Sequence, residues 1–273
     1  MQEVEANSKA GSTDEPHEGL VNRGSELLRA AALKRPLLIM QTGTSLPAIR
    51  ERHGDFPEWF RRGLGLTPPQ VVCVRVDAGV APPPPRHVAA VVITGSAAMV
   101  SEHLDWSERA VDWLRTAADV GTPMLGVCYG HQLLAHAFGG HVDYNPRGRE
   151  IGTVNIERLP AAADDALFGT LPPVFRAQTT HLQSVLRPPS AAAVLARSTL
   201  DDCQALRHAP HVWGVQFHPE FGVAHMRGYL RERADAVNGE GLDAQRLSRQ
   251  VGASPDARAL LRRFVRIAAD IHR

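Results

Sequence analysis

Short apolar runs and amphipathic stretches alternate along the first half of the chain. Four apolar runs, PLLIMQ, QVVCVRV, HVAAVVI and PMLGVC, begin at residues 36, 70, 87 and 123, and helical periodicity appears over residues 49–62, 105–118 and 129–140. A run that is short and apolar throughout is typical of a strand buried on both faces of a parallel sheet. The alternation predicts an α/β fold, with a mostly parallel central sheet and helices on both faces.

The second half of the chain carries a different pattern. Strand-like segments follow one another from residue 151 to residue 217, namely IGTVNIERL, VFRAQ, AAVLARS, CQALRH and HVWGVQF. We expect them to extend the same sheet, partly in antiparallel fashion. From Gly222 onward the pattern is helical. The last helix has Ser254 as its predicted N-cap, Pro255 at its first position and apolar residues along one face.

The composition of the two ends sets the predicted domain organisation. Residues 1–34 are rich in Glu, Ser, Gly and Asn and lack sustained apolar periodicity, which is typical of a disordered tail. Residues 35–235 contain the alternating elements and form the predicted α/β domain. Residues 236–273 are predicted to be a helical extension that packs on this domain.

Charge and cysteine content exclude several classes of protein. A formal net charge of +1 gives no basic footprint for nucleic acid, and no apolar run is long enough for a membrane span. The N-terminus is polar and acidic, unlike a secretory signal. Cys73, Cys128 and Cys203 are widely spaced without a CxxC pair, which favours neither a disulfide framework nor a zinc site. We therefore expect a cytoplasmic protein whose thiols stay reduced.

One segment, Gly126-Val127-Cys128-Tyr129-Gly130, lies between a predicted buried strand and a predicted helix. A G-x-nucleophile-x-G pattern at such a turn is typical of a nucleophile elbow, whose tight geometry requires the glycines. Cys128 would stand at the helix N-terminus, where the helix dipole and free N–H groups favour the thiolate and can hold an oxyanion. The alternative is a buried cysteine that ends a core strand.

A second motif supplies candidates for a base. His218, Pro219 and Glu220 follow the apolar strand HVWGVQF. Residues two apart on an extended backbone point to the same side, so His218 and Glu220 can face one site, where the carboxylate would fix the imidazole tautomer. The alternative is a strand end with a surface ion pair, and the elbow elsewhere argues against it. With Cys128, the two residues predict a cysteine enzyme of acyl transfer or hydrolysis.

The two motifs together resemble a known family. GVCYGHQLLAHAFGG, followed about 90 residues later by GVQFHPEF, resembles the class I glutamine amidotransferases, in particular their stand-alone, GMP-synthase-like branch, over roughly residues 36–235. The resemblance implies a flavodoxin-like fold and a glutaminase reaction. Cys128 would attack the side-chain carbonyl of glutamine, His218 would transfer the proton, and Glu220 would orient His218. Ammonia would leave, and water would hydrolyse the γ-glutamyl thioester.

The same resemblance assigns the oxyanion hole to backbone N–H groups. Tyr129, directly after the nucleophile, would supply one donor. Gly95-Ser96 stands where many members of the family carry Gly-Gly-Pro in a strand-end loop, and this loop would supply the other donor.

The resemblance also implies three substrate-binding residues. Gln132 matches the glutamine of the family's C-x-G-x-Q motif, and His181 and Leu182 lie in the loop that would contact the substrate's α-amino and carboxylate groups. This loop reads Thr-His-Leu-Gln where synthetase-linked members read Ser-His-Gly-Asp. The departure leaves the exact small-molecule substrate open.

Three alternatives use the same motifs. A γ-glutamyl peptidase or hydrolase would cleave other γ-glutamyl amides with the same machinery. A related elbow-cysteine protein of the protease or chaperone type would lack the downstream His-Pro-Glu segment. A non-catalytic regulatory protein on this fold would lack a member of the triad, and the sequence has all three.

The sequence also bears on cofactors and on a partner that could use the ammonia. The chain has no SGGxDS-like or G-x-x-x-x-G-K-[ST] phosphate loop. Either a separate synthetase subunit receives the ammonia or the protein hydrolyses its substrate alone, and the departing substrate loop favours the second. No His, Cys, Asp and Glu residues show metal-site spacing, so we expect no metal and no other cofactor. His131 and His136 lie five apart on a helix and do not share a face well.

Overall fold

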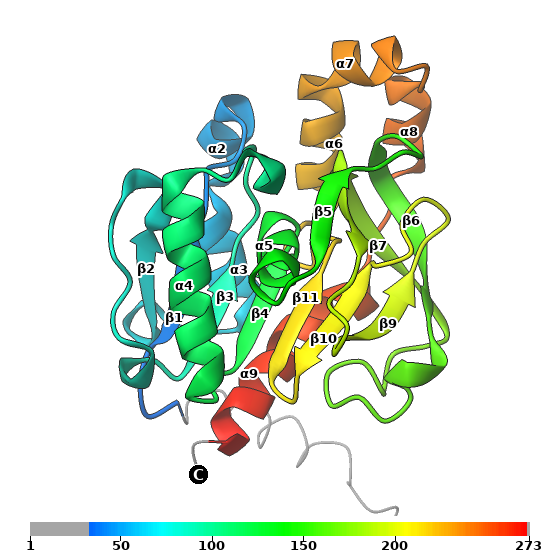
Figure 1. Ribbon diagram of the computed structural model, residues 1–273. Coiled ribbons are helices and arrows are strands. Elements are labelled where there is room, and N and C mark those ends of the chain that lie inside the picture. The colour runs from blue at the N-terminus through cyan, green and yellow to red at the C-terminus, as the bar shows by residue number, and fades with distance from the viewer. Residues whose placement is uncertain (1–32, 272–273) are drawn as a thin grey trace, which may run out of the picture.

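The computed structural model describes residues 33–271, so nearly all of the predicted tail at residues 1–34 lies outside the described residues. The described part contains one large sheet flanked by helices, which confirms the predicted α/β class (Figure 1). A separate pair of short strands, β5 and β8, stands beside it.

Nine strands form the large sheet in the order β2-β1-β3-β4-β11-β10-β9-β6-β7. Neighbours from β2 to β11 are parallel, and neighbours from β11 to β7 are antiparallel. The strand bounds are β1 Leu37–Gln41, β2 Val71–Arg75, β3 Ala90–Ile93, β4 Met124–Val127, β5 His141–Tyr144, β6 Glu150–Arg158, β7 Val174–His181, β8 Gln183–Arg187, β9 Ala193–Arg197, β10 Ala205–Ala209 and β11 Val212–Val215.

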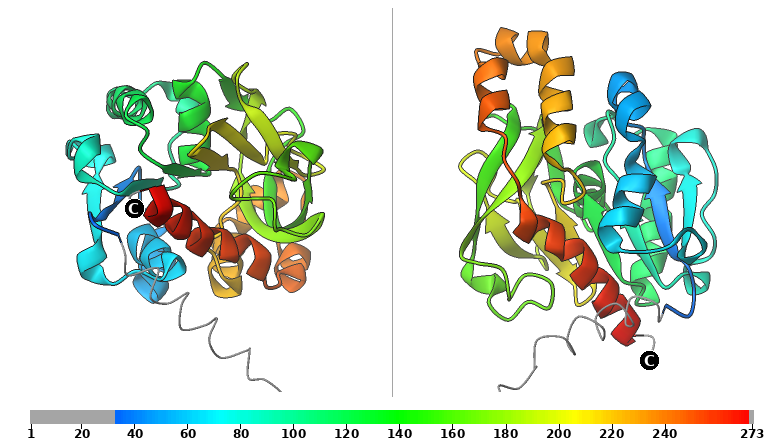
Figure 2. Two further views of the ribbon diagram at one scale, coloured as in Figure 1. Left: turned by 90° about the horizontal axis from the view of Figure 1, so that it is seen from below. Right: turned by 180° about the vertical axis from the view of Figure 1, so that it is seen from behind.

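Helices cover both faces of the sheet, and further helices stand at one end of its strands (Figures 1 and 2). Their bounds are α2 Pro47–His53, α3 Phe56–Leu64, α4 Asp105–Asp119, α5 Tyr129–Ala137, α6 Val223–Glu232, α7 Ala234–Gly239, α8 Ala244–Gln250 and α9 Pro255–Ile271. None of the helices in the described part is both long and apolar enough to cross a membrane.

The apolar runs are explained by two hydrophobic cores, one on each side of the sheet. In β1, Leu37 and Ile39 belong to one core and Leu38 and Met40 to the other, and all four side chains are fully buried. Successive residues of a strand point to opposite faces, so a strand covered on both faces needs apolar residues at every position.

The C-terminal helix α9 packs along the back of the sheet (Figure 2). Its Leu261 lies so close to Gly63 of α3 that a Cβ on Gly63 would come within 2.4 Å of a Leu261 methyl group. Leu260 and Phe264 of α9 belong to the same core as the sheet residue Trp213. The predicted domain boundary at residue 235 falls inside α7.

Two local predictions differ from the structure. The helical stretch over residues 49–62 is divided into α2 and α3, because Gly54 has a φ of 78° and the Asp55 side chain then caps α3 by accepting from the Phe56 N–H. The strands β5 and β8 were not predicted. They are short and carry exposed residues such as Tyr144 and Leu186, so their pattern is not that of a core strand.

Candidate active site

Cys128 occupies the sharp turn between β4 and α5. Its φ of 53° and ψ of −105° are unusual for a residue with a side chain. Such conformations cost about 1–3 kcal/mol and are concentrated at active sites. A Cβ on Gly126 would lie 2.3 Å from the Gly130 carbonyl oxygen, and a Cβ on Gly130 would lie 2.5 Å from the Ile93 carbonyl oxygen. Both glycines are therefore required for space, as the elbow predicts.

His218 and Glu220 form a buried pair just beyond the end of β11. The His218 Nδ1 lies 2.7 Å from Glu220 Oε1, and the two residues are 2% and 1% exposed. The spacing of the two residues predicted this pairing from an extended backbone. In the structure the strand has ended at Val215 and the chain turns, with the Phe221 N–H donating to the His218 carbonyl. The pairing predicted from spacing is present, but a turn produces it.

Gly95 lies beside both the imidazole and the cysteine. A Cβ built on Gly95 would lie 3.1 Å from His218 Cε1 and 3.8 Å from Cys128 Cβ, so these two side chains approach one another across this glycine. His218 Nε2 is buried and has no hydrogen-bond partner within residues 33–271, while its Nδ1 bonds Glu220. This nitrogen is free to exchange a proton with the sulfur or with a substrate.

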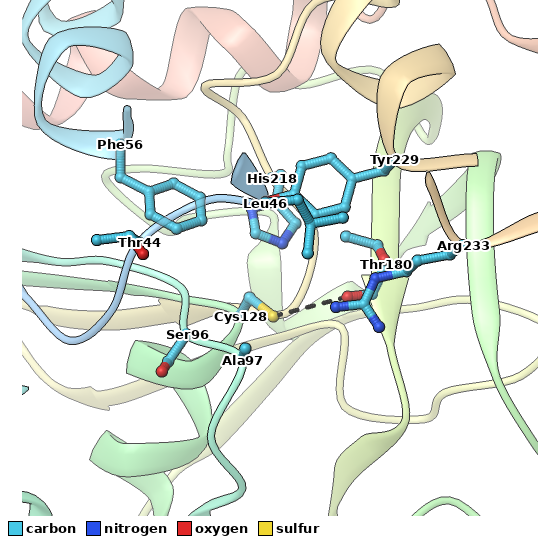
Figure 3. Close-up of a pocket in the computed structure, with 10 residues that line it drawn as sticks. All are labelled: Thr44, Leu46, Phe56, Ser96, Ala97, Cys128, Thr180, His218, Tyr229 and Arg233. Carbon is cyan, nitrogen blue, oxygen red and sulfur yellow. Dashed lines mark hydrogen bonds between the residues drawn. The ribbon is translucent and has the colours of Figure 1, made fainter. Parts of the chain in front are cut away.

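One cavity holds both side chains (Figure 3). It is lined by Thr44, Leu46, Phe56, Ser96, Ala97, Cys128, Thr180, His218, Tyr229 and Arg233. A second cavity shares Cys128, Ser96, Ala97, Thr180 and Arg233 with the first and continues toward Gln132 and the 181–183 segment. The sulfur of Cys128 therefore faces a pocket that extends to both sides of it.

The charges around Cys128 favour a thiolate beside an imidazolium. Burial raises the pKa of the Cys128 thiol, but His218 outweighs burial and lowers this pKa overall. Burial lowers the pKa of His218, but Glu220 and the cysteine outweigh it and raise this pKa to about 10. The stacked ring of Phe221, 4.1 Å from the imidazole centroid, holds the His218 ring in place.

The other two cysteines have different surroundings. Partial loss of hydration and the nearby Asp55 charge raise the pKa of Cys73, and burial raises the pKa of Cys203 to about 12. Cys73 lies on the edge strand β2 and is exposed, although its sequence context suggested an apolar interior. Cys128 alone among the three has a lowered thiol pKa.

The backbone around Cys128 offers N–H groups for an oxyanion. Tyr129 is the first residue of α5, so its N–H has no carbonyl partner inside the helix. Gly95 and Ser96 follow β3 directly, and Ser96 and Ala97 line the pocket beside the sulfur. The Ser96 hydroxyl accepts from the Ala98 N–H and turns away from Cys128, so only the backbone of Ser96 faces the nucleophile (Figure 3).

Two of the predicted substrate-binding residues line the wall of the second cavity through fixed side chains. Gln132 Nε2 donates to the Gln183 carbonyl at 2.7 Å and to Gln216 Oε1 at 2.9 Å. His181 lies between Glu150 Oε2 at 3.0 Å and the Gln183 carbonyl at 3.0 Å. Since both imidazole nitrogens of His181 are occupied, this ring supports the wall and has no nitrogen left for a substrate.

Burial lowers the pKa of His181, but Glu150 outweighs burial and raises this pKa overall. His181 also lowers the pKa of Cys128. Leu182, the third predicted residue, lines the cavity between His181 and Gln183.

Two arginines in the pocket were not predicted. Arg149 and Arg233 both line the second cavity, and Arg233 also lines the first. The sequence contains no motif around Arg233. This residue follows the helix α6, which contacts β6 and β7 and stands at one end of the sheet (Figure 1). No signal in the pattern of residues would have found it.

Three side chains outside the pocket form a candidate metal site, which the sequence did not predict. His103, Glu108 and His136 have ligand atoms within 4.8 Å of one another and could hold a metal ion. Glu108 Oε1 lies 3.0 Å from His103 Nδ1 and 3.1 Å from His136 Nε2. Spacing along the sequence could not show this group, because its members come from a loop and from two different helices. They lie outside both cavities that contain Cys128.

The fold and the pocket define a class of protein: an α/β protein with a cysteine at a nucleophile elbow beside a buried His–Glu pair. The model of the glutamine amidotransferase class-I family matches residues 59–233. The chain belongs to this family.

Named relatives and solved structures agree with the family. A GMP synthase (glutamine-hydrolyzing) of Aeropyrum pernix is 37% identical over 175 residues, which cover 64% of this chain and 31% of that protein. A GMP synthase (glutamine-hydrolyzing) subunit of Methanocaldococcus jannaschii is 35% identical over 120 residues, 43% of this chain and 60% of that protein. The chain therefore spans less than two thirds of either relative.

Among solved structures, a glutamine amidotransferase of Thermotoga maritima superposes with a TM-score of 0.69 at 18% identity, over 86% of this chain and 99% of that one. A glutamine amido transferase of Methylobacillus flagellatus superposes with a TM-score of 0.63 at 22% identity, over 86% and 93% of the two chains. These similarities show the fold, which is the predicted class I amidotransferase fold.

Proposed function

We propose that the protein hydrolyses the side-chain amide of glutamine, or of a γ-glutamyl compound, with Cys128 as nucleophile, His218 as proton carrier and Glu220 as the group that orients His218. The observation that carries the proposal is the buried His218–Glu220 pair, 2.7 Å apart, in the same pocket as the elbow cysteine. Membership of the glutamine amidotransferase family supports an amide of glutamine as the bond that is cleaved.

In the first half of the reaction, the Cys128 thiolate attacks the γ-carbonyl carbon. The carbonyl oxygen becomes an oxyanion, which the Tyr129 N–H and an N–H of the Gly95-Ser96 loop can stabilise. The His218 imidazolium donates its Nε2 proton to the departing nitrogen as the C–N bond breaks. Ammonia or an amine leaves, and a γ-glutamyl thioester on Cys128 remains.

In the second half, neutral His218 takes a proton from a water molecule, and the resulting hydroxide attacks the thioester carbonyl. The C–S bond breaks, the thiolate is restored, and glutamate or the corresponding acid leaves. Glu220 stabilises the imidazolium in both halves without accepting the proton itself.

The fate of the nitrogen separates two forms of the proposal. Several relatives are named as one subunit of a GMP synthase, which supports transfer of the ammonia to a separate synthetase subunit. The segment Thr180-His181-Leu182-Gln183 departs from the synthetase-linked Ser-His-Gly-Asp form and supports hydrolysis by the chain alone. We propose the second form, with glutamine and other γ-glutamyl amides as candidate substrates.

The test uses the purified chain and a panel of γ-glutamyl compounds that includes free glutamine. We expect at least one compound to release its amine or ammonia with a kcat of about 1 per second or more, and Cys128→Ala to abolish the release. A chain that remains inert on every compound until a synthetase subunit is added would overturn the autonomous form. Equal turnover by Cys128→Ala would overturn the proposed nucleophile.

A further inference from the structure

The pocket around Cys128 contains more positive than negative charge on its antiparallel side. Arg149 and Arg233 both line it, and one carboxylate, Glu240, is near them. Glu240 already pairs with Arg149: its two carboxylate oxygens accept from the Nε and from one terminal nitrogen of Arg149, at 2.7 and 2.8 Å. Arg233 forms no ion pair with any described carboxylate.

Arg233 is also incompletely hydrogen-bonded. Its Nε is buried and has no partner within the part of the chain that the structure describes. Burial lowers the pKa of Arg233, and the nearby charge of Arg149 lowers it further. Arg233 as a whole is partly buried, and an incompletely paired cation in such a place is costly, so an anionic ligand would supply the missing charge.

The position of Arg233 indicates which ligand this is. The guanidinium lies in the cavity that Cys128 lines, on the side of Thr180 (Figure 3). A guanidinium presents a planar fork of N–H donors, which matches a carboxylate in a bidentate arrangement. A γ-glutamyl substrate carries such a group at its α-carbon, a few bonds away from the carbonyl that Cys128 would attack.

We propose that Arg233 binds the α-carboxylate of the substrate and that this contact makes the enzyme specific for γ-glutamyl amides with a free α-carboxylate. The inference rests on the proposed function, because it assumes that the reacting amide is positioned at Cys128. Arg233 is the single residue between α6 and α7, so the junction of these two helices sets its position. The Arg149–Glu240 pair fixes the far end of α7 to the start of β6, so the junction is held over the pocket.

The catalytic test compares L-glutamine with L-glutaminamide, in which the α-carboxylate is an uncharged amide, by release of ammonia. For the wild-type chain we expect kcat/KM to be about 10- to 100-fold higher with L-glutamine, which is typical of a charge-assisted hydrogen bond. Arg233→Met should reduce this preference to within about 3-fold, chiefly through KM, and Arg233→Lys should retain part of it.

Arg231→Met is the matched control. Arg231 lies two residues earlier, is exposed on α6 and pairs with Glu232, so its loss should leave the preference unchanged. If Arg233→Met retains the wild-type preference for L-glutamine, the subsite is wrong.

A second measurement needs no turnover, so it separates failure of the subsite from failure of the proposed function. Iodoacetate and iodoacetamide alkylate a thiolate at equivalent carbons and differ in charge. We expect Arg233→Met, but not Arg231→Met, to lower the ratio of iodoacetate to iodoacetamide labelling at Cys128 by about 10-fold or more. An unchanged ratio would contradict the anion site even if glutamine is hydrolysed. A lowered ratio in a chain that hydrolyses nothing would retain the anion site and reject the activity.

The same variants exclude an indirect role. If Arg233 acted by stabilising the thiolate, its loss would raise the pKa of Cys128 and slow both reagents. Because Arg233 and the Cys128 thiolate attract one another, some loss of rate with both reagents is expected, and an anion site requires a larger loss with iodoacetate than with neutral iodoacetamide.

Discussion

The parallel half of the sheet and the antiparallel half contribute different groups to the same pocket. The parallel strands β4 and β11 lead into Cys128 and His218, the residues we propose for the chemistry. The antiparallel strand β7 and the junction of α6 and α7 supply His181 and Arg233 to the opposite wall, and Glu150 of β6 holds His181 from behind. We therefore expect reaction chemistry and substrate recognition to be carried by separate parts of one sheet. Variants in the first half should then change kcat, and variants in the second should change KM or specificity.

The largest effect is expected from Cys128→Ala and His218→Ala. Each should reduce kcat by about 10³-fold or more, because a nucleophile and its proton carrier act as one unit. The unfolding transition of each variant should remain cooperative. A glutamine-like chloroketone should label Cys128 in the wild-type chain but not Cys73, although Cys73 is exposed. Comparable labelling of Cys73 would count against the assignment.

Glu220→Gln should have a smaller effect on kcat and a distinct effect on its pH dependence. Glu220 raises the pKa of His218, and the imidazolium in turn lowers the pKa of Cys128. Activity of the wild-type chain should rise as Cys128 ionises and fall as His218 loses its proton near pH 10. Without the Glu220 charge, the pKa of His218 should fall and the alkaline limb should move to lower pH. A pH profile of kcat/KM with an unchanged alkaline limb would contradict the role of Glu220.

Gly130→Ala tests whether the elbow depends on space alone. The added Cβ would lie 2.5 Å from the Ile93 carbonyl oxygen, so β3 and α5 would have to separate. Overpacking of this kind reduces the free energy of unfolding by about 1–3 kcal/mol. Gly239→Ala is the control, because a Cβ there would meet nothing within 4 Å and its φ is not positive. Denaturant titrations that gave both variants equal stability would show that the elbow can relax.

The smallest effect on the chemistry is expected from Glu150→Gln in the antiparallel half. It should raise KM with little change in kcat, since His181 supports the wall of the pocket. It should also reduce stability by about 1–3 kcal/mol, because Glu150 accepts from His181 and from Ser198 in the interior.

The pKa of His181 is raised in the folded chain, so its stabilising contribution is complete below the unfolded pKa of about 6.5 and is lost as pH rises through the folded value. The stability difference between wild type and Glu150→Gln should therefore shrink at higher pH. A fall in kcat as large as that of His218→Ala would break the proposed division between the two halves.

The sequence predicted strands in both halves of the large sheet but not the two strands of the separate small sheet. Strands β1, β3 and β4 are buried on both faces, so their apolar runs are unmistakable. The strands β5 and β8 were missed because each is short and partly exposed. The pairing of His218 with Glu220 was predicted correctly, but from an extended backbone that the structure replaces with a turn.

The sequence by itself determined the features that depend on neighbouring residues along the chain, namely the elbow and the order of strands and helices. Gly126, Cys128 and Gly130 specify the elbow because the steric conflict they avoid lies within a few residues of the turn and on the adjacent strand. The order of strands and helices follows from hydrophobic period for the same local reason. Only the tertiary structure decided which charges face Cys128. Arg233 lies 105 positions beyond the cysteine along the chain (233 minus 128), and no periodic or motif signal connects them. The burial that leaves the Arg233 Nε without a partner among the described residues exists only when α6 and β7 have packed, because desolvation is a property of the assembled pocket and not of the residue.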